Sequence, residues 1–460
     1  MQIYVDIMKH FDKLLRDNET LKKGKLKDEY FTRKSKLGFE ELMKFILSRT
    51  GKTTSNEINN YYSEIDKLEQ SISKQSIFQA REKLNPSVFR YLNQEMIKFY
   101  YKKNKIQKKN NYVLLAIDGT VLEMPLNKET EASFGLVRGH KTSIYTKTMP
   151  RCSGIYDVIN NVYLDFIVNH YTTSEIPMAY EQIKIVKRVW NKEKCIFLAD
   201  RYYGATDLFL YIESLGYKYC FRGKKNFYKH YLDDSCEDSI VSIPLDEKWI
   251  NRFKIEEVKE NALKEGKINI RVVRFNKSTI IGREIDNDEE ILLFTNLSPE
   301  EYNKEEIIEL YGKRWRIETG YGTLKTKMEF ERVTSEKPNL ILQDIYSQII
   351  VYNQMSIIKN IADKTINNTE KYKYQININN LICLYKKWLP KILSNIKLIN
   401  SILKTLINKI TKNKEPIRKN RFFKRWNTYI NKPPTLKFRV DGKRNPTTHK
   451  TKKGYLRISR

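Results

Sequence analysis

The stretch YVLLAIDGT, residues 112–120, decides the fold class. Five apolar or small residues run without interruption into Asp118, and Gly119 and Thr120 follow it. An unbroken apolar run of this length is typical of a strand that is buried on both faces. The sequence therefore predicts a buried strand that delivers a carboxylate at its C-terminal end.

A second apolar run ends in an acidic residue in the same way. It is KCIFLADRYYG, residues 194–204, in which Asp200 follows the apolar residues directly. The neighbouring predicted elements are a hairpin that turns at Asn160-Asn161, two helices and a third strand: residues 154–171, 174–190, 206–216 and 217–224. Strands mixed with helices, the first strand pair being antiparallel, predict an α/β fold.

A β-rich block interrupts this domain before a long helix. Residues 225 to about 297 contain INIRVVRF, STIIGREI and EEILLFTNL, which all have the composition of strands. Ser298-Pro299-Glu300-Glu301 then supplies a capping serine, proline at the first helical position and glutamate at the third. The predicted helix runs from Pro299 through YGKRWRIETGYGTLK, residues 311–325.

Four residues of that helix share one face. On a continuous α-helix with about 100° per residue, Tyr311, Arg314, Glu318 and Lys325 fall within an arc of about 60°. This stripe suits a site in which the acid holds a metal and its neighbours hold phosphate oxygens. The alternative is an ordinary ion pair between Arg314 and Glu318, four residues apart. The helix alone leaves both interpretations open.

The two strand-end aspartates favour the first interpretation. Carboxylate oxygens are the ligands that Mg²⁺ prefers, and a pair of metal ions can activate the attacking oxygen and stabilise the leaving oxygen in phosphoryl transfer. Asp118, Asp200 and Glu318 form a plausible set, with two acids on strands and one on a helix. Other acids compete for the third place, and spacing alone does not exclude them: Asp207, Glu309 and Glu329.

These motifs together resemble the DDE transposases of bacterial insertion sequences, in the branch (insertion-sequence family four) with a Tyr-x2-Arg-x3-Glu-x6-Lys signature. Residues 311, 314, 318 and 325 match that spacing without a gap. The first acid resembles the family's strand followed by Asp-Gly-Thr, and Asp200-Arg201-Tyr202-Tyr203 resembles its second acidic motif. Residues 153–166 resemble the hairpin between them, and residues 73–89 the helical N-terminal region. The likeness covers about residues 70 to 335.

The resemblance implies a ribonuclease-H-like core interrupted by the β-rich insertion. It implies a dimer that binds double-stranded DNA, namely terminal inverted repeats and target DNA. It also implies cleavage with two Mg²⁺ ions, for which Mn²⁺ substitutes, a hairpin intermediate, and joining of the ends to the target.

Carried over by position, the resemblance gives each residue of the signature a role. Asp118, Asp200 and Glu318 are then the catalytic metal ligands. The DNA-binding residues are Tyr311, Arg314, Lys325 and, as the aromatic side chain that stacks on a flipped base, Trp249 of the insertion. A tryptophan in a β-rich segment is more often a core residue, so this last role has a structural alternative.

Three regions follow from this interpretation. Residues 1–108 are expected to form a helical N-terminal DNA-binding domain. Residues 109–335 are expected to form the catalytic domain, with the insertion at about 225–297. Residues 336–460 are expected to form a helical C-terminal region with a basic tail.

The charge supports a nucleic-acid partner. The formal net charge is +30, and residues 411–460 carry 17 Lys and Arg against two acids. This tail is expected to be a weakly ordered arm on phosphates, or else a solubilising tail.

No stretch of 18 apolar residues and no signal-peptide pattern is present, which predicts a cytoplasmic protein without a membrane partner. The resemblance implies that this protein is bacterial and associated with the nucleoid. Five scattered cysteines without a Cys-x-x-Cys pair predict reduced core residues and no structural zinc.

Two alternatives remain open from the sequence. One is a ribonuclease-H-like DNA nuclease that cuts without strand transfer. The other is a DNA-binding protein derived from a transposase that no longer cuts, which the intact set of three acids disfavours.

Overall fold

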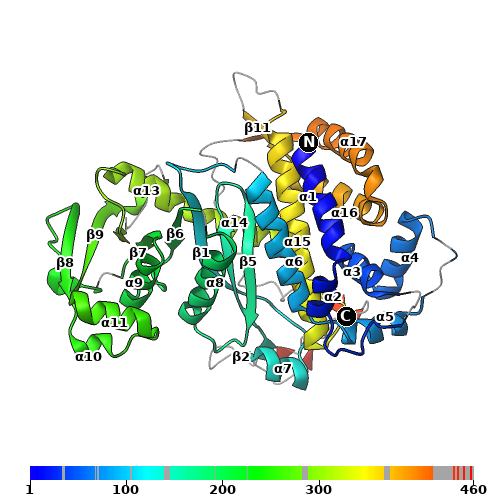
Figure 1. Ribbon diagram of the computed structural model, residues 1–460, viewed down its shortest axis with the longest axis horizontal. Coiled ribbons are helices and arrows are strands. Elements are labelled where there is room, and N and C mark those ends of the chain that lie inside the picture. The colour runs from blue at the N-terminus through cyan, green and yellow to red at the C-terminus, as the bar shows by residue number, and fades with distance from the viewer. Residues whose placement is uncertain are drawn as a thin grey trace.

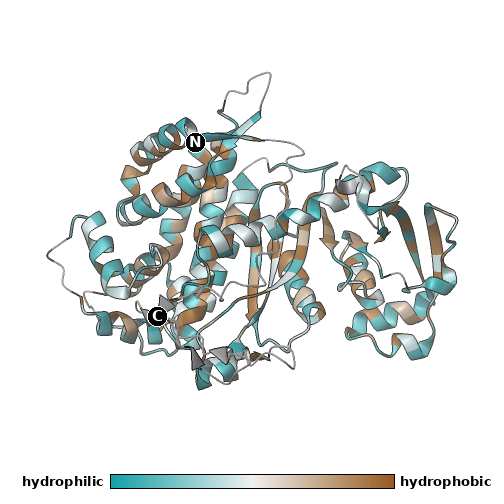
Figure 2. Cartoon of the chain, turned by 180° about the vertical axis from the view of Figure 1, so that it is seen from behind, coloured by the Kyte–Doolittle hydropathy of each residue, from teal (hydrophilic) through white to brown (hydrophobic). Residues whose placement is uncertain are grey.

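The structure is a computed structural model of the chain. It describes residues 1–33, 37–67, 69, 72–103, 106–138, 146–191, 193–224, 226–281, 289–366 and 373–417, together with the strand pairs at 439–440, 443–444, 449–450 and 456–457. Figure 1 shows a central sheet, an extension that carries β8 and β9 at one end, and a layer of helices at the other end. Apolar residues gather on the strands and on the inner faces of the helices (Figure 2).

The sheet has eight strands in the order β5-β4-β1-β6-β7-β10-β9-β8. The apolar run around Asp118 forms β1 (Val113–Val121) at its centre. β4 (Arg151–Asp157) and β5 (Val162–Asn169) continue antiparallel on one side, and β6 (Cys195–Ala199) and β7 (Lys218–Arg222) continue parallel on the other. This mixed pattern confirms the expected α/β core of the ribonuclease H type.

The insertion extends the same sheet. β10 (Glu290–Thr295) pairs antiparallel with β7, and β9 (Lys267–Asn276) and β8 (Asp238–Pro244) complete the edge. The insertion also contains short helices: η1 (Lys229–Tyr231), α10 (Glu247–Ile250), α11 (Glu256–Glu265) and α12 (Lys277–Ile281). The strand predicted from STIIGREI is therefore wrong in its first residues, which form α12, and the rest of it lies outside the described residues.

Helices cover both faces of the core sheet. Ser153 of β4 donates a hydrogen bond to Gln182 of α8 (Glu175–Val189), while the next residue, Gly154, meets Tyr321 of α14 (Arg316–Gly322). Because successive side chains of a strand point to opposite faces, α8 and α14 lie on opposite sides of the sheet. The remaining elements near the core are α7 (Lys128–Phe134), β2 (Leu136–Arg138), β3 (Thr146–Thr148) and α9 (Thr206–Ser214).

The N-terminal and C-terminal regions form one helical layer (Figure 1). Its N-terminal helices are α1 (Gln2–Leu15), α2 (Asn18–Gly24), α3 (Phe39–Leu47), α4 (Thr54–Glu64), α5 (Lys74–Glu82) and α6 (Ser87–Lys103). Its C-terminal elements are α15 (Pro338–Asp363), β11 (Lys373–Ile376), α16 (Ile378–Ser394), η4 (Ile396–Leu398), α17 (Ile399–Lys412) and β12 (Lys414–Ile417). The long α15 runs through the middle, and α3, α5, α6 and α16 pack against it.

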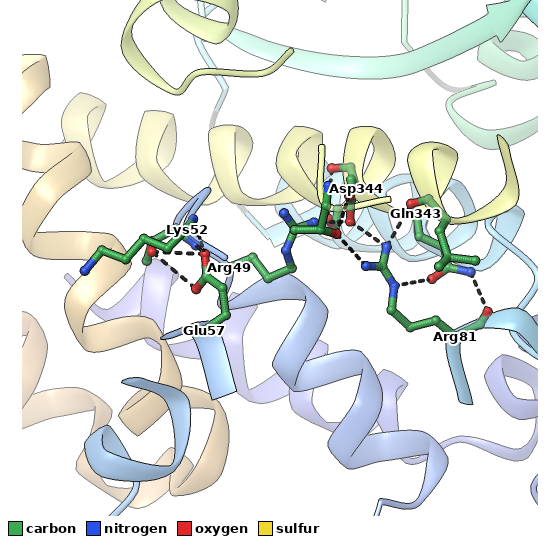
Figure 3. Close-up of polar contacts among 10 residues, drawn as sticks. Arg49, Lys52, Glu57, Arg81, Gln343 and Asp344 are labelled. Carbon is green, nitrogen blue, oxygen red and sulfur yellow. Dashed lines mark hydrogen bonds and ion pairs between the residues drawn. The ribbon is translucent and has the colours of Figure 1, made fainter. Parts of the chain in front are cut away.

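A buried ionic cluster fastens this layer together (Figure 3). Asp344 of α15 accepts from Arg81 of α5 at 2.5 Å and from Arg49, which follows α3, and all three side chains are buried. Arg81 also donates to Gln343, and Thr334 donates its backbone N–H to Asp344 at 2.9 Å. The two arginines thus share one carboxylate, and the Nε of Arg49 is buried without a hydrogen-bond partner among the described residues.

The cysteines and the start of the basic tail differ in part from what the sequence predicts. Cys152, Cys195 and Cys220 are buried and free as expected, whereas Cys236 is partly exposed and Cys383 exposed, because both lie outside the sheet core. The first residues of the basic tail are ordered, since β12 pairs antiparallel with β11.

The rest of the tail lies outside the described residues, apart from four two-residue strands that pair as β13 (Arg439–Val440) with β14 (Lys443–Arg444) and β15 (His449–Lys450) with β16 (Leu456–Arg457). Within the described part of the chain, no helix combines the length and the apolar character needed to cross a membrane.

Candidate functional site

The two aspartates lie at the same end of two neighbouring strands. β1 and β6 pair in parallel with Ala116 opposite Leu198, and Asp118 and Asp200 each follow two residues later. Because the step along both strands is equal, both acids reach the same edge of the sheet. The Asp200 carboxylate accepts the backbone N–H of Tyr202 at 2.8 Å, which fixes its position in the turn after β6.

Asp118 lies in an electrostatically unusual place. Burial raises the pKa of its carboxyl to about 7, Arg314 opposes this, and Asp200, Glu318 and Glu175 raise it further. These four charged side chains are therefore within electrostatic range of Asp118. An acidic group with such a pKa is half protonated near neutral pH and would gain from a cation that relieves the repulsion.

The expectation of one continuous helix from Pro299 is wrong. Residues 299–301 form a turn, and α13 (Lys304–Gly312) begins after Asn303, whose side chain forms a reciprocal capping box with Glu306. A 3₁₀ turn, η2 (Lys313–Trp315), α14 and a π-helical stretch, η3 (Thr323–Lys327), follow in succession. The α-helix gives way to another helix type after Gly312 and after Gly322, where a glycine weakens it, and it resumes as α14 after Trp315.

Three of the four signature residues stay together despite the changes of helix type, and Lys325 makes its contacts elsewhere. Arg314 donates to Oε1 of Glu318 at 3.0 Å, so the ion pair of the alternative interpretation is present. The Arg314 side chain is 8% exposed and that of Glu318 51% exposed. Tyr311 is buried, with the Arg314 guanidinium 5.7 Å from the centre of its ring. The Nε of Arg314 is buried without a hydrogen-bond partner among the described residues.

Lys325 contacts the first acidic motif directly. Its ammonium donates to Thr120 Oγ1 at 2.6 Å and to the carbonyl of Val121 at 2.7 Å. The structure thus brings Lys325 to the end of β1, two residues beyond Asp118, while Glu318 approaches the same strand from the preceding helix.

Tyr321 attaches that helix to the strand. Its hydroxyl donates to the Asp118 carbonyl at 2.6 Å and accepts the N–H of Gly154 at 3.0 Å. Asp118 and Gly154 are opposite each other in the β1–β4 pair, so the hydroxyl bridges the two strands. Gly320 permits the close approach, because a Cβ there would lie 2.7 Å from the Tyr163 hydroxyl.

Replacing Tyr321 by phenylalanine is expected to destabilise the protein by about 1–3 kcal/mol, since it leaves the buried carbonyl of Asp118 and the N–H of Gly154 without this partner. The measurement is chemical denaturation monitored by circular dichroism. Tyr211→Phe is the control, because the Tyr211 hydroxyl has no hydrogen bond among the described residues and the ring is partly exposed. Equal stability of both variants would contradict the bridging role.

Comparisons with known proteins agree with this geometry. The family model described as transposase DDE domain matches residues 109–354, which is more than half of the chain. The chain belongs to the DDE transposase family. No curated protein matches the chain.

Among solved structures, this DDE transposase is similar to one determined by cryo-EM as the piggyBac transposase synaptic complex with hairpin DNA. The identity is 10%, the match covers 88% of this chain and 85% of that chain, and the TM-score is 0.44.

The acids of this transposase suit divalent metal ions by their chemistry. All are oxygen donors, and the raised pKa of Asp118, caused by burial and neighbouring acids, indicates a place where a cation is favoured. Only Oε1 of Glu318 accepts a hydrogen bond from Arg314, so Oε2 is available as a metal ligand. As the side chains are placed, no three His, Cys, Asp or Glu groups of the described residues are close enough together to hold an ion.

One residue near the site was missed by the sequence reasoning. Glu175, at the start of α8, accepts from Arg151 at 2.8 Å, and a Cβ on Gly119 would lie 2.4 Å from its Oε1. The glycine after Asp118 is thus needed to leave room for this carboxylate. No spacing in the sequence links Glu175 to Asp118, because only the sheet brings α8 beside β1.

Trp249 does not lie with the acids. It is on α10 at the end of the insertion, far from α14 (Figure 1). Its ring is partly buried and lies 5.9 Å from the ring of Tyr228. Two aromatic side chains that the sequence reasoning did not select are exposed beside the candidate metal ligands: Tyr202, two residues after Asp200, and Trp315, three residues before Glu318.

Proposed function

We propose that this protein is a DNA transposase of the branch with the Tyr-Arg-Glu-Lys signature. It binds the terminal inverted repeats of its own bacterial insertion sequence as a dimer, cuts them by Mg²⁺-dependent phosphoryl transfer through a hairpin, and joins the ends to target DNA. The observation that carries this proposal is the position of Asp118 and Asp200 at one sheet edge, with the Glu318 helix attached there by Tyr321.

In this proposal Asp118, Asp200 and Glu318 hold two Mg²⁺ ions, and Mn²⁺ can replace them. When bound, the ions activate the attacking oxygen and stabilise the leaving oxygen. Arg314 orients Glu318 through their ion pair, and its guanidinium is the kind of planar fork that binds phosphate.

Three further residues have proposed roles toward DNA. Tyr311 is buried beneath Arg314, so it acts on DNA through that side chain. Lys325 places its positive charge beside the cut end. Trp249 stacks on a base of a DNA segment that reaches the insertion.

The proposal is tested with end-labelled DNA from the sequence that flanks the coding region, purified protein and Mg²⁺. Denaturing gels resolve the nicked, hairpin and joined products. All three products are expected from the wild-type protein. Nicking without hairpin or joined product would support the nuclease alternative, and binding without any cut would support the DNA-binding alternative.

Arg314→Lys is expected to nick the first strand but to lose hairpin and joined products by about tenfold more than the nick. Lysine keeps the charge but loses the planar fork that can hold Glu318 and a phosphate together. The same gels measure the three products. Lys313→Gln, which removes a partly buried charge one residue away that pairs with Glu309, serves as the control. An equal loss of all three products would make Arg314 a structural partner of Glu318 only.

Deleting residues 418–460 is expected to lower affinity for DNA of any sequence and to reduce the slope of log affinity against log salt, because fewer counterions are released. The deleted segment carries 15 Lys and Arg and one acid, and the deletion spares β12. Binding is measured by fluorescence anisotropy between about 50 and 200 mM salt. A Gly/Ser segment of equal length is the control. An unchanged slope would mean that the tail does not touch phosphate.

A further inference from the structure

A cavity of about 440 Å³ lies where the N-terminal helices, the end of η3 and α16 meet. Its apolar wall includes Phe45, Met328 and Ile382. Its charged side chains come from all three regions of the chain: Lys52, Glu57, Glu64, Lys327, Glu329, Lys386 and Lys387. The site described above does not use this cavity.

The acids that line the cavity already have hydrogen-bond or ion-pair partners. Oε1 of Glu57 accepts the backbone N–H groups of Thr50 at 2.8 Å and Lys52 at 2.7 Å, and Figure 3 shows this carboxylate beside Lys52. Glu64 pairs with Lys391 at 3.6 Å. Glu329 pairs with Arg332 at 2.5 Å. Glu64 and Glu329 are therefore paired with cations from outside the cavity, and Glu57 is held by backbone N–H groups.

The lysines that line the cavity have no such partners among the described residues. Among the described residues, none makes an ion pair or a side-chain hydrogen bond with Lys52, Lys327, Lys386 or Lys387. Lys386 is partly buried, and burial lowers the pKa of its ammonium to about 8, with Glu57 and Glu329 acting against this and Arg49 with it. A partly buried cation without a partner is costly unless an anion pairs with it. The cavity thus has an excess of positive charge.

We propose that this cavity binds a phosphate group of the DNA backbone through Lys386, Lys387 and Lys327. The inference rests on the proposed function for the source of that phosphate. Lys327 is two residues beyond Lys325, whose ammonium contacts the end of β1, so the cavity and the acids are joined by one short segment. In this proposal, a DNA strand that passes the acids makes its next contact at the cavity. Free phosphate has the same chemistry, and the experiment separates the two sources.

The first arm uses inorganic phosphate alone and measures thermal unfolding of the full chain against sodium chloride of equal ionic strength. Phosphate is expected to raise the Tm of the wild-type protein and not of Lys386→Gln. Lys404→Gln is the matched control, because it removes an exposed lysine of α17 outside the cavity. Without phosphate, Lys386→Gln is expected to be as stable as the wild type or more stable, which shows that the variant folds. If phosphate does not raise the Tm of the wild-type protein, or raises the Tm of all three proteins equally, the cavity is not a phosphate-binding site.

The second arm uses a duplex of about 30 base pairs without inverted repeats. Lys386→Gln is expected to lose about fivefold in affinity at about 0.15 M salt and to reduce the salt slope by about one, the values for one phosphate contact. Lys404→Gln is expected to keep the wild-type affinity. If both variants bind the duplex with equal affinity, and phosphate raises the Tm in the first arm, the cavity binds free phosphate and not the DNA backbone.

The two proposals fail separately. Asp118→Asn is expected to keep the phosphate effect of the first arm, because Asp118 does not line the cavity. Loss of DNA cutting by the wild type with the phosphate effect retained would contradict the proposed function alone.

Discussion

Asp118→Asn, Asp200→Asn and Glu318→Gln are each expected to reduce DNA cleavage at least about a thousandfold, which corresponds to about 4 kcal/mol of barrier. Each change keeps the size of the side chain and removes the charge that would hold a metal ion, so a two-metal site misplaces its nucleophile. The strands that carry Asp118 and Asp200 do not depend on these charges, since Tyr321 contacts the backbone of Asp118, and Glu318→Gln keeps a side-chain oxygen that can accept from Arg314.

Binding to end DNA is expected to survive in all three variants, because affinity comes mainly from Lys and Arg contacts to phosphate. Glu309→Gln is the matched control: this acid lies on α13, is exposed and pairs with Lys313. Cleavage and binding are measured on the same labelled duplex. If Glu318→Gln cleaves DNA at the wild-type rate while Glu309→Gln or Glu329→Gln loses cleavage, the third metal ligand is that other acid and not Glu318.

Asp344→Ala is expected to have the largest effect on stability, about 3–5 kcal/mol. It leaves the buried guanidinium groups of Arg49 and Arg81 without their shared counter-charge, which is the costly way to break a buried ion pair. It also removes the acceptor of the Thr334 backbone N–H. Because α3 and α5 both meet α15 at this cluster, the loss is expected to loosen the whole helical layer (Figure 3).

Chemical denaturation measures this effect, and Glu19→Ala is its control. Glu19 pairs with Lys23 at 3.6 Å on the surface, where removal is expected to cost at most about 1 kcal/mol. Burial by itself raises the pKa of Asp344, but Arg49 and Arg81 outweigh it and the pKa is lowered. The stabilisation is therefore present above the unfolded pKa of about 3.9 and is lost as the pH falls below it. Equal losses in the two variants would contradict the role of the cluster.

Much of the core could be predicted from the sequence, because its strands are short apolar runs with clear ends. The two runs before Asp118 and Asp200 became β1 and β6, and the turn at Asn160-Asn161 became the connection of β4 and β5. Parallel pairing of β1 with β6 then brings both acids to one edge without further information.

The signature helix could not be predicted in the same way. Ser298 does accept the N–H of Glu301 at 3.3 Å, but the chain makes only a turn there, and the better cap at Asn303 starts the helix later. Local capping patterns thus mark two possible starts, and the reciprocal capping box at Asn303 selects the later one. The contacts of Tyr321 and Glu175 with β1 and its neighbours join residues far apart in the sequence, so no spacing rule could have found them.

The central claim is that Asp118 is a metal ligand in a DNA-cutting centre, and one measurement tests it most directly. Asp118→Cys is assayed for cleavage of labelled end DNA in Mg²⁺ and in Mn²⁺, with wild type and Asp118→Asn beside it. A thiolate is a poor ligand for Mg²⁺ but a better one for softer ions such as Mn²⁺. We expect no cleavage by the cysteine variant in Mg²⁺, partial recovery in Mn²⁺, and no recovery of Asp118→Asn in either metal. Wild-type cleavage by Asp118→Cys in Mg²⁺ would contradict the claim.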